Sequence, residues 1–253
     1  NGSYGAGSVS NTGQRTGNYC GKIAGTGGHN ITLTGLKPNT YYVWSGYCKA
    51  PATNEPLWIG AKAFDGLGGE TASPISATSY KKNSVAFKTG PSNTTATLYF
   101  WKPSGTGTGY GDDFELKEAN NLMVNPGFET GDSWNITNGT AAVVNTNQRS
   151  GSYCGRFTGF GGFEQQVVGL KPNTTYIFTG SVKAGSASEP IYVGVKSFNG
   201  SGGELSVAIT LPNYTWEDVE FTTGPSDTSA TVYFWKPSGS AVSYGDDFIV
   251  FEK

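Results

Sequence analysis

The stretch ATVYFWKPSGSAVSYGDDF, residues 230–248, decides the fold, and a close copy of it occurs earlier in the chain. The earlier copy, residues 96–114, reads ATLYFWKPSGTGTGYGDDF and aligns without a gap, 134 residues upstream (230 minus 96). Each copy contains an alternating strand, a Pro-Gly break, a loop and a short strand led by two aspartates. The chain is therefore predicted to contain two copies of one β-rich unit.

Alternation along the first strand of this stretch separates its side chains into two faces. One face is apolar and belongs to a core: Ala230, Val232 and Phe234. The other face carries a threonine and two large rings: Thr231, Tyr233 and Trp235. Large rings on a non-core face indicate a binding surface, although aromatic packing beneath a loop is an alternative. The earlier copy repeats the pair as Tyr99 and Trp101.

Composition favours an all-β protein with many turns. The 253 residues include 38 glycines, only 14% are charged, and 13% are aromatic. The net charge of −2 without a basic run argues against nucleic acid as a partner. No run of 18 apolar residues exists, so no membrane span is expected. Because Asn1 is not a natural start, we expect a fragment or a mature product.

Turn signals divide the chain into short strands. GLKPNT occurs at residues 35–40 and 169–174, and Pro and Asn favour a turn there. Turn signals recur every 8 to 15 residues or so without helical periodicity, which is typical of a β-sandwich. We predict an all-β fold of two tandem β-sandwich (jelly-roll) domains. The first covers residues 1–117 and lacks an opening strand; the second covers residues 122–253.

A second alternating strand adds to the non-core face. In EPIYVGVKSF, residues 189–198, Tyr192, Gly194 and Lys196 share that face. The equivalent EPLWIGAKAF, residues 55–64, supplies Trp58 and Lys62. A glycine between an aromatic residue and a lysine is expected to open space for a close approach.

Cysteine and histidine offer little chemistry. Cys20 and Cys154 are equivalent, whereas Cys48 corresponds to a valine. We favour three small buried hydrophobic residues over a Cys20–Cys48 disulfide, which the second unit could not repeat. His29 corresponds to Phe163, so a histidine-based catalytic triad in each repeat is excluded.

NPGFE at residues 125–129, together with YGDDF at residues 244–248, resembles bacterial carbohydrate-binding modules of the family 4, 9, 16 and 22 type. Those modules are jelly rolls attached to secreted polysaccharide-degrading enzymes. The resemblance covers residues 122–253, and the first unit lacks the opening motif. It implies a structural calcium ion, and a glycan on the concave sheet or along the loops at its edge.

The carboxylates of these two motifs fit the implied calcium. Phe128 and Phe248 should point into the core, so Glu129 and Asp247 point the other way. If the first and last strands pair, these carboxylates meet and offer the hard oxygens that Ca²⁺ prefers. Asp113 is the corresponding ligand in the first unit, where no partner glutamate precedes it. A catalytic carboxylate pair is the rival interpretation.

Sugar binding needs flat rings against pyranose C–H faces and polar groups for the hydroxyls. The first unit supplies Trp58, Lys62, Tyr99 and Trp101. The second supplies Tyr192, Lys196, Tyr233 and Trp235. Further candidates are Trp134, Gln165, Gln166, Glu70 and Glu204.

We therefore predict non-catalytic polysaccharide binding that targets a larger secreted bacterial glycoside hydrolase or lyase to its substrate. Neutral β-glucan or β-mannan chains are favoured, and the lysines leave an anionic polysaccharide open. The expected partners are a polysaccharide or oligosaccharide and a catalytic domain, and the expected state is a secreted or cell-surface monomer. The alternatives are an adhesion or structural β-sandwich pair whose aromatic face is a protein interface, and an enzyme.

Overall fold

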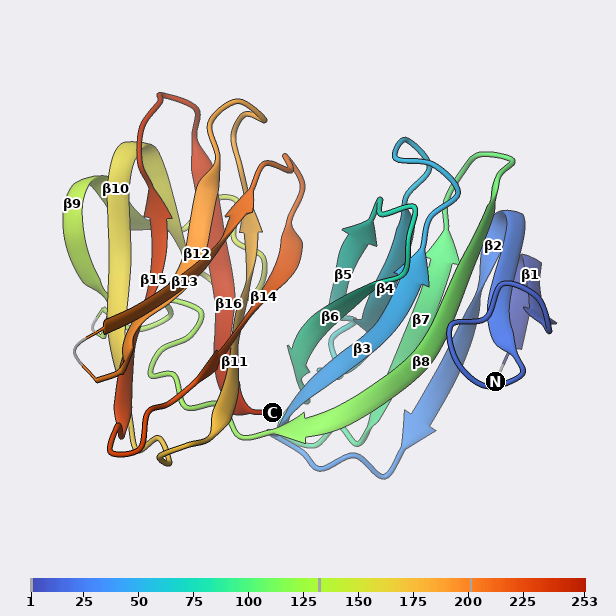
Figure 1. Ribbon diagram of the computed structural model, residues 1–253, viewed down its shortest axis with the longest axis horizontal. Helices are drawn as coiled ribbons and strands as arrows, with labels where there is room; N and C mark the ends of the chain where they lie inside the picture. The colour runs from blue at the N-terminus through green and yellow to red at the C-terminus, as the bar shows by residue number, and fades with distance from the viewer. Residues whose placement is uncertain (1, 132, 201) are drawn as a thin grey trace. The chain divides into compact units, whose positions relative to one another are not determined.

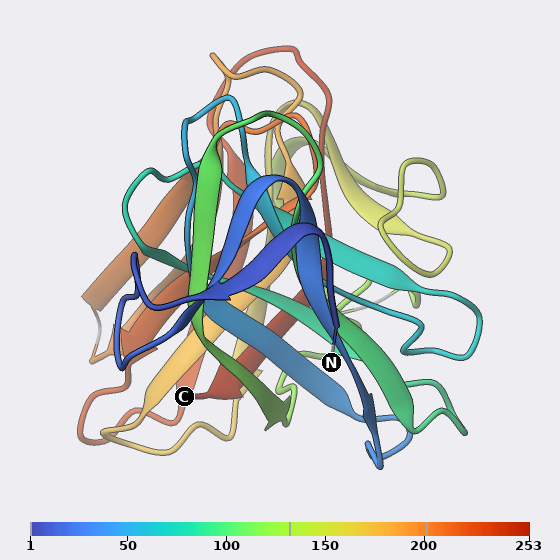
Figure 2. The ribbon, with the colours of Figure 1, turned by 90° about the vertical axis from the view of Figure 1, so that its right-hand side faces the viewer.

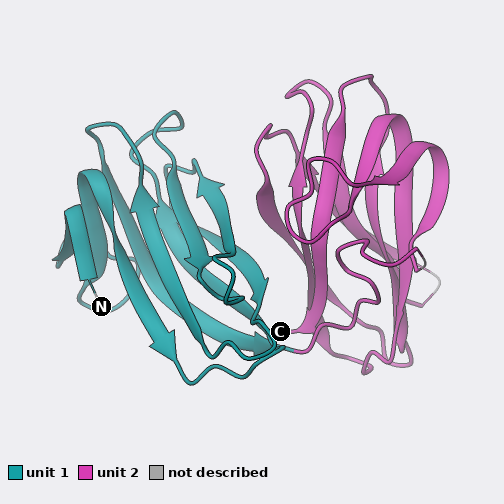
Figure 3. Ribbon diagram, turned by 180° about the vertical axis from the view of Figure 1, so that it is seen from behind, with its two compact units in different colours: residues 1–119 teal, residues 120–253 magenta. Residues whose placement is uncertain are grey.

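The protein is all-β and divides into two compact units. The computed structural model describes residues 2–131, 133–200 and 202–253, and its regular elements are all strands (Figure 1). Unit 1 comprises Asn1–Ala119 and unit 2 Asn120–Lys253 (Figure 3). The boundary lies between the expected domain ends, residues 117 and 122.

Unit 2 contains eight strands within its described residues. They are β9 (Asn135–Val144), β10 (Cys154–Val168), β11 (Thr175–Lys183), β12 (Ile191–Asn199), β13 (Gly202–Ile209), β14 (Thr215–Thr222), β15 (Ser229–Lys236) and β16 (Ser243–Glu252). The sheet order is β13-β12-β15-β10-β16-β11-β14, and β9 pairs with β10. All of these pairings are antiparallel.

The glycine-rich strand β10 joins the two layers of the sandwich. Its first half pairs with β16, through Gly155–Phe157, and its second half pairs with β15. Between the halves the register with β9 shifts at Phe157/Gly161, and such irregularities bend a strand. One layer therefore contains β13, β12, β15, β10 and β9, and the other contains β16, β11 and β14.

Unit 1 repeats this topology. Its strands are β1 (Gly2–Ser10), β2 (Cys20–Thr34), β3 (Tyr41–Lys49), β4 (Leu57–Lys62), β5 (Glu70–Ile75), β6 (Lys81–Lys88), β7 (Thr95–Lys102) and β8 (Thr108–Ala119). The order is β5-β4-β7-β2-β8-β3-β6, with β1 on β2 at the front of Figure 2. The predicted pair of β-sandwich domains is thus confirmed.

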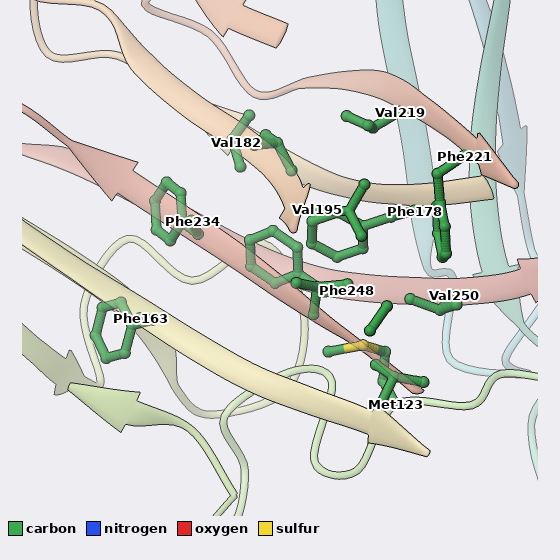
Figure 4. Packing of buried hydrophobic residues seen from close by; sticks show 14 of the residues in the cluster. Met123, Phe163, Phe178, Val182, Val195, Val219, Phe221, Phe234, Phe248 and Val250 are labelled. Atoms are coloured by element: carbon green, nitrogen blue, oxygen red, sulfur yellow. The ribbon is translucent and has the colours of Figure 1, made fainter. Parts of the chain in front are cut away.

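The core of unit 2 is aromatic, and it contains the residues that alternation placed inside. Val232 and Phe234 of β15 are fully buried, and Phe234 packs against Phe248 with ring centroids 5.5 Å apart (Figure 4). Phe178 stacks on Phe248 at 5.7 Å. Burying one such side chain contributes about 1.5–3 kcal/mol to folding.

The opening segment of unit 2, residues 121–134, was predicted to be a strand, and that prediction is wrong. Its described residues form a loop that contacts β16 through single backbone hydrogen bonds. Leu122 N–H donates to the Val250 carbonyl at 2.9 Å, and Phe248 N–H donates to the Pro126 carbonyl at 3.0 Å. Phe128 has a positive φ of 61°, which a regular strand does not accommodate. The loop nevertheless inserts Phe128 into the core, at 2% exposure.

Unit 1 has a hollow where unit 2 contains Phe128 and Trp134. These two rings pack on each other at 4.9 Å and on Phe163 and Phe248. In unit 1, His29 is equivalent to Phe163 and Phe114 to Phe248. These two residues line a hollow of about 350 Å³. The described residues of unit 1 supply no counterpart of the opening segment there.

Trp44 and the three cysteines are structural. Trp44 is 8% exposed and stacks on Phe114 at 5.1 Å, as expected of a core residue. Cys20, Cys48 and Cys154 are all buried free thiols, which agrees with the favoured interpretation of small hydrophobic residues.

Candidate functional site

A groove of about 500 Å³ lies on unit 2, on the face of the five-stranded layer that points away from the core. All five strands contribute to it. Five of its residues were candidates from the sequence: Tyr192, Lys196, Glu204, Tyr233 and Trp235. The sequence did not point to its other polar residues: Thr137 and Asn138 of β9, Glu164 of β10 and Ser206 of β13.

Strand register arranges the groove in three rows. The first row places Trp235 between Gly162 and Tyr192. The second places Tyr233 between Glu164 and Gly194. The third places Lys196 opposite Glu204. The first row is therefore aromatic, the second combines a tyrosine with a glutamate, and the third is charged.

Glycines in the first two rows let the rings lie flat on the sheet. A Cβ added at Gly194 would lie 2.2 Å from Cζ of Tyr233, and one at Gly162 would lie 2.6 Å from Cε3 of Trp235. The space over Gly194 is thus filled by the Tyr233 ring, which is only 8% exposed. The expectation that this glycine admits an outside group is therefore wrong, because the glycine admits a neighbouring side chain.

Tyr233 of the groove is held by a glutamate. The Tyr233 hydroxyl donates to Oε1 of Glu204 at 2.7 Å. Burial, and then this hydrogen bond, raise the pKa of Tyr233 to about 12. The phenol therefore stays protonated at neutral pH and holds its ring in place.

Lys196 also has a partner. Its ammonium forms an ion pair with the Glu164 carboxylate and lies 5.9 Å from the Tyr233 ring centroid. The Lys196 side chain is 37% exposed and that of Glu164 is 26% exposed. Both can therefore reach the hydroxyls of a ligand in the groove.

Unit 1 has an equivalent groove of about 360 Å³, lined by Tyr4, Asn30, Lys62, Glu70, Tyr99 and Trp101. The Tyr99 hydroxyl donates to Oε1 of Glu70 at 2.6 Å, as its equivalent does in unit 2. Trp58 pairs with Trp101 across β4 and β7 but does not line the groove. Lys62, Tyr99 and Trp101 are thus brought together as predicted, with Trp58 beside them.

Two predicted binding residues are structural instead. Trp134 packs in the core against Phe128, and its indole N–H donates to the Asn125 carbonyl at 2.9 Å. Gln165 is 4% exposed. Its amide bonds both backbone groups of Val124, donating at 2.7 Å and accepting at 2.8 Å. Both side chains anchor the opening loop rather than a ligand.

Strand parity could have corrected the choice of Gln165. Phe163 and Val167 of β10 are buried in the core, so alternation places Gln165 with them and Glu164 on the groove face. Asn138 gave no comparable signal, because β9 was not predicted as a strand.

Three carboxylates gather near Gly127 in unit 2. A Cβ built on Gly127 would lie 3.5 Å from Oδ1 of Asp246, 3.7 Å from Oδ1 of Asp247 and 3.7 Å from Cγ of Glu129. Burial raises the pKa of Asp246 to about 8. The pKa of Asp247 is also raised, mainly by burial and with a contribution from Glu129.

Backbone amides already contact these carboxylates. Glu129 accepts hydrogen bonds from the N–H groups of Ser152 and Tyr153, at 2.9–3.1 Å. Asp247 accepts one from the Ser150 hydroxyl at 2.6 Å. In this arrangement no three His, Cys, Asp or Glu side chains of the described residues have the geometry of a metal site.

Asp113, the matching aspartate of unit 1, has a different environment. It accepts a hydrogen bond from the Thr16 hydroxyl and forms an ion pair with Arg15 at 2.6 Å. The Thr16 hydrogen bond and then the Arg15 guanidinium lower the pKa of Asp113. Asp113 thus already has a cationic partner within the protein.

Comparison with known proteins identifies relatives of part of the chain. Residues 120–241 match a family described as carbohydrate binding domain. A keratan-sulfate endo-1,4-β-galactosidase of Sphingobacterium multivorum is 42% identical over 130 residues, 50% of this chain and 30% of that protein. Exochitinase 1 of Streptomyces olivaceoviridis is 32% identical over 130 residues, 50% of this chain and 21% of that protein. The chain therefore spans less than a third of each of these relatives.

Solved structures with similar folds include carbohydrate-binding modules. The CBM22-1–CBM22-2 tandem domain of Paenibacillus barcinonensis Xyn10C is covered to 93% by the whole of this chain, with 14% identity and a TM-score of 0.42. A family 16 carbohydrate-binding module is matched over its full length by 52% of this chain, with 25% identity and a TM-score of 0.47.

No helix long and apolar enough to cross a membrane occurs in the described part of the chain.

Proposed function

Because residues 120–241 match a family of carbohydrate-binding domains, we propose that the groove of unit 2 binds a polysaccharide, with Trp235 and Tyr192 as its stacking platform. The observation that carries this proposal is the composition of the groove. Tyr192 of β12 and Trp235 of β15 are cross-strand neighbours. Next to them lie the ion pair of Lys196 with Glu164 and the hydrogen bond from Tyr233 to Glu204. Rings of this kind pack on pyranose C–H faces, and the charged groups bond hydroxyls.

The proposed ligand is a chain of β-linked hexopyranoses. The groove is lined by more aromatic than charged side chains, and Lys196 pairs with Glu164, which favours neutral chains such as β-glucan or β-mannan. The names of the two curated relatives add keratan sulfate and chitin to the panel to be tested. The groove of unit 1 is proposed to bind in the same manner through Trp101, Trp58 and Lys62.

Affinity electrophoresis in gels containing each polysaccharide tests the proposal. Trp235→Ala should weaken binding by unit 2 by about 1–3 kcal/mol, borrowing the scale for rings stacked on nucleic-acid bases. Tyr19→Ala is the control, because Tyr19 is an aromatic residue that is 66% exposed outside both grooves. Trp235→Ala combined with Trp101→Ala should abolish retardation. Unchanged retardation in this folded double variant would instead favour the aromatic face as a protein interface.

We further propose a structural calcium ion in unit 2, with Glu129 and Asp247 as side-chain ligands. The donors are all oxygens, as Ca²⁺ prefers, and a bound cation would offset the charge repulsion and burial that raise the pKa of Asp246 and Asp247. Its chemistry would be structural, since it would tie the opening loop to β16. Asp113 is excluded from this proposal because Arg15 pairs with it.

Removing calcium should lower the melting temperature of unit 2, because an ion that binds only the folded state stabilises it. Scanning calorimetry with and without a chelator measures the shift, and calcium titration of the chelated protein measures the affinity. Glu129→Gln should reduce both effects, whereas Asp113→Asn in unit 1 should leave them unchanged. An identical melting temperature with chelator and with calcium would refute the structural role.

The family match and the relatives' lengths also support proposals about the whole protein. We propose that the chain is a non-catalytic, secreted part of a larger polysaccharide-degrading enzyme, which it targets to its substrate. Incubating the protein with each polysaccharide that it binds and assaying for reducing ends tests the absence of catalysis. Release of oligosaccharides by the purified chain would contradict it.

A further inference from the structure

The two grooves carry a lysine at the same place but give it different partners. Lys196 of unit 2 forms an ion pair with Glu164. Glu164 pairs in register with Tyr233, and the residue that pairs with the equivalent Tyr99 in unit 1 is Asn30. A carboxylate in one groove is thus replaced by a neutral amide in the other.

This replacement leaves the lysine of unit 1 without the ion-pair partner that Glu164 provides in unit 2, so Glu70, opposite Lys62 on β5, is the one carboxylate of its groove. Lys62 is exposed, and among the described residues it forms no ion pair. The groove of unit 1 is lined by one lysine and one carboxylate, and the groove of unit 2 by one lysine and two carboxylates. The unit 2 groove is therefore more negative by one charge.

The remaining carboxylate of the unit 1 groove is engaged elsewhere. Glu70 accepts the Tyr99 hydroxyl at 2.6 Å, as Glu204 accepts that of Tyr233. The tyrosine–glutamate pair is therefore common to both grooves. The difference in charge lies at the position of Asn30 and Glu164.

We propose that the groove of unit 1 binds a polysaccharide segment that carries an anionic substituent, a sulfate ester or a carboxylate, placed on Lys62, and that the groove of unit 2 binds an uncharged segment. This inference rests on the proposed function, since it assigns ligand classes to the same two grooves. An anion at Lys62 can accept a charge-assisted hydrogen bond from an ammonium that has no other ion-pair partner. An anion on Lys196 would have to compete with Glu164, whereas the other carboxylate, Glu204 opposite Lys196, has an equivalent in Glu70 opposite Lys62.

The experiment uses the full chain with one groove disabled at a time. Trp235→Ala leaves the unit 1 groove, and Trp101→Ala leaves the unit 2 groove. The probes are keratan sulfate, chemically desulfated keratan sulfate and polygalacturonic acid, titrated by calorimetry at low and high salt. The Trp235→Ala protein should bind the sulfated chain about fivefold more tightly than the desulfated chain, the scale of one exposed ion pair. Salt should remove that preference.

Exchanging the partner residues tests the cause. Asn30→Glu in the Trp235→Ala background should abolish the preference, and Glu164→Asn in the Trp101→Ala background should create one. Asn30→Gln is the matched control, because it keeps a neutral amide. Polygalacturonic acid distinguishes a carboxylate from a sulfate as the anion that Lys62 accepts.

The outcomes separate the two proposals. If the Trp235→Ala protein binds sulfated and desulfated chains equally, or if Asn30→Glu changes nothing, this inference is overturned while polysaccharide binding stands. If neither single-groove protein binds any of these probes or the neutral glucan, mannan and chitin chains, although each keeps its melting temperature, the proposed function itself fails.

Discussion

At the scale of single residues, the groove depends on which side chains its glycines accommodate. Gly194 and Gly60 let Tyr233 and Tyr99 lie against the sheet, since a Cβ would come within 2.2–2.3 Å of the ring in each unit. Each ring then reaches a glutamate on the next strand but one. The floor of the groove is therefore a product of side-chain packing on a particular backbone.

Gly194→Ala should destabilise unit 2 by about 1–3 kcal/mol, the usual cost of forcing extra volume into a packed site. The Tyr233 ring must move, so binding should weaken as well. Chemical denaturation followed by the fluorescence of Trp216 and Trp235 measures the first effect, and calorimetry with a bound polysaccharide measures the second. Gly200→Ala is a control for steric crowding, because no atom lies within 4 Å of a Cβ there, although its φ of 63° adds backbone strain. Equal stability of Gly194→Ala and wild type would show that the ring is not confined.

The sequence predicted the groove residues on β12 and β15 because alternation there is unbroken. It misassigned Gln165, whose neighbours Phe163 and Val167 are core residues that set the parity of β10. It also misassigned Trp134, because a loop has no alternation to follow and an aromatic residue near a sugar-binding motif suggested a ligand. Contacts such as Gln165 with Val124 depend on residues 41 positions apart, which no local pattern contains.

At the scale of elements, the loop after β15 is held by a buried lysine. Lys236 is fully buried and pairs with Glu189 at 2.8 Å, and Glu189 also accepts the Ala241 N–H at 2.7 Å. Lys102 and Glu55 repeat the pair at 2.7 Å in unit 1. The lysine that follows each groove tryptophan thus fixes the loop next to the groove, which explains why FWKPSG recurs in both units.

Acid should weaken this anchor. The hydrogen bond from Lys236, and then the one from Ala241, lower the pKa of Glu189 below its usual value of 4.5. A carboxyl whose pKa is lower in the folded state stabilises the protein above that usual value and loses the contribution as pH falls through the folded pKa. The melting temperatures of wild type and Glu189→Gln should therefore differ at pH 7 and converge below about pH 4, where Glu189 becomes protonated.

A surface ion pair supplies the control for that comparison. Glu220→Gln removes the partner of Lys253 in a pair whose side chains are about half exposed, and such pairs contribute little. A pH-independent difference between wild type and Glu189→Gln would mean that packing, not charge, holds the loop.

At the scale of the whole molecule, two grooves on one chain imply avidity. Each groove is shallow, and single-site affinities of about micromolar to millimolar are expected. Linking two sites makes the second contact intramolecular, which can raise the affinity for a long chain about 10²- to 10⁴-fold. A short oligosaccharide cannot span both sites and should bind with single-site affinity.

Titrating wild type and the Trp101→Ala protein with a long polysaccharide and with a short oligosaccharide checks this expectation. Wild type should bind the long chain more tightly than Trp101→Ala does, and the two proteins should differ little for the short one. Equal affinities for the long chain would show that the two grooves do not engage one polymer together.

The near-identity of β7 and β15 has a consequence for how the chain reaches its native state. Each strand must pair with its own long neighbour, β2 or β10. Even the closest pairs, Thr34 with Thr95 and Val168 with Ser229, are 61 residues apart in the sequence (95 minus 34 and 229 minus 168). The wrong neighbour presents the same alternation and the same glycines, so mispaired hairpins between the repeats lie close in energy to the correct ones. Duplication that doubles the binding surface thereby creates kinetic traps during refolding. Synthesis from the N-terminus reduces them, because unit 1 is complete before β15 leaves the ribosome.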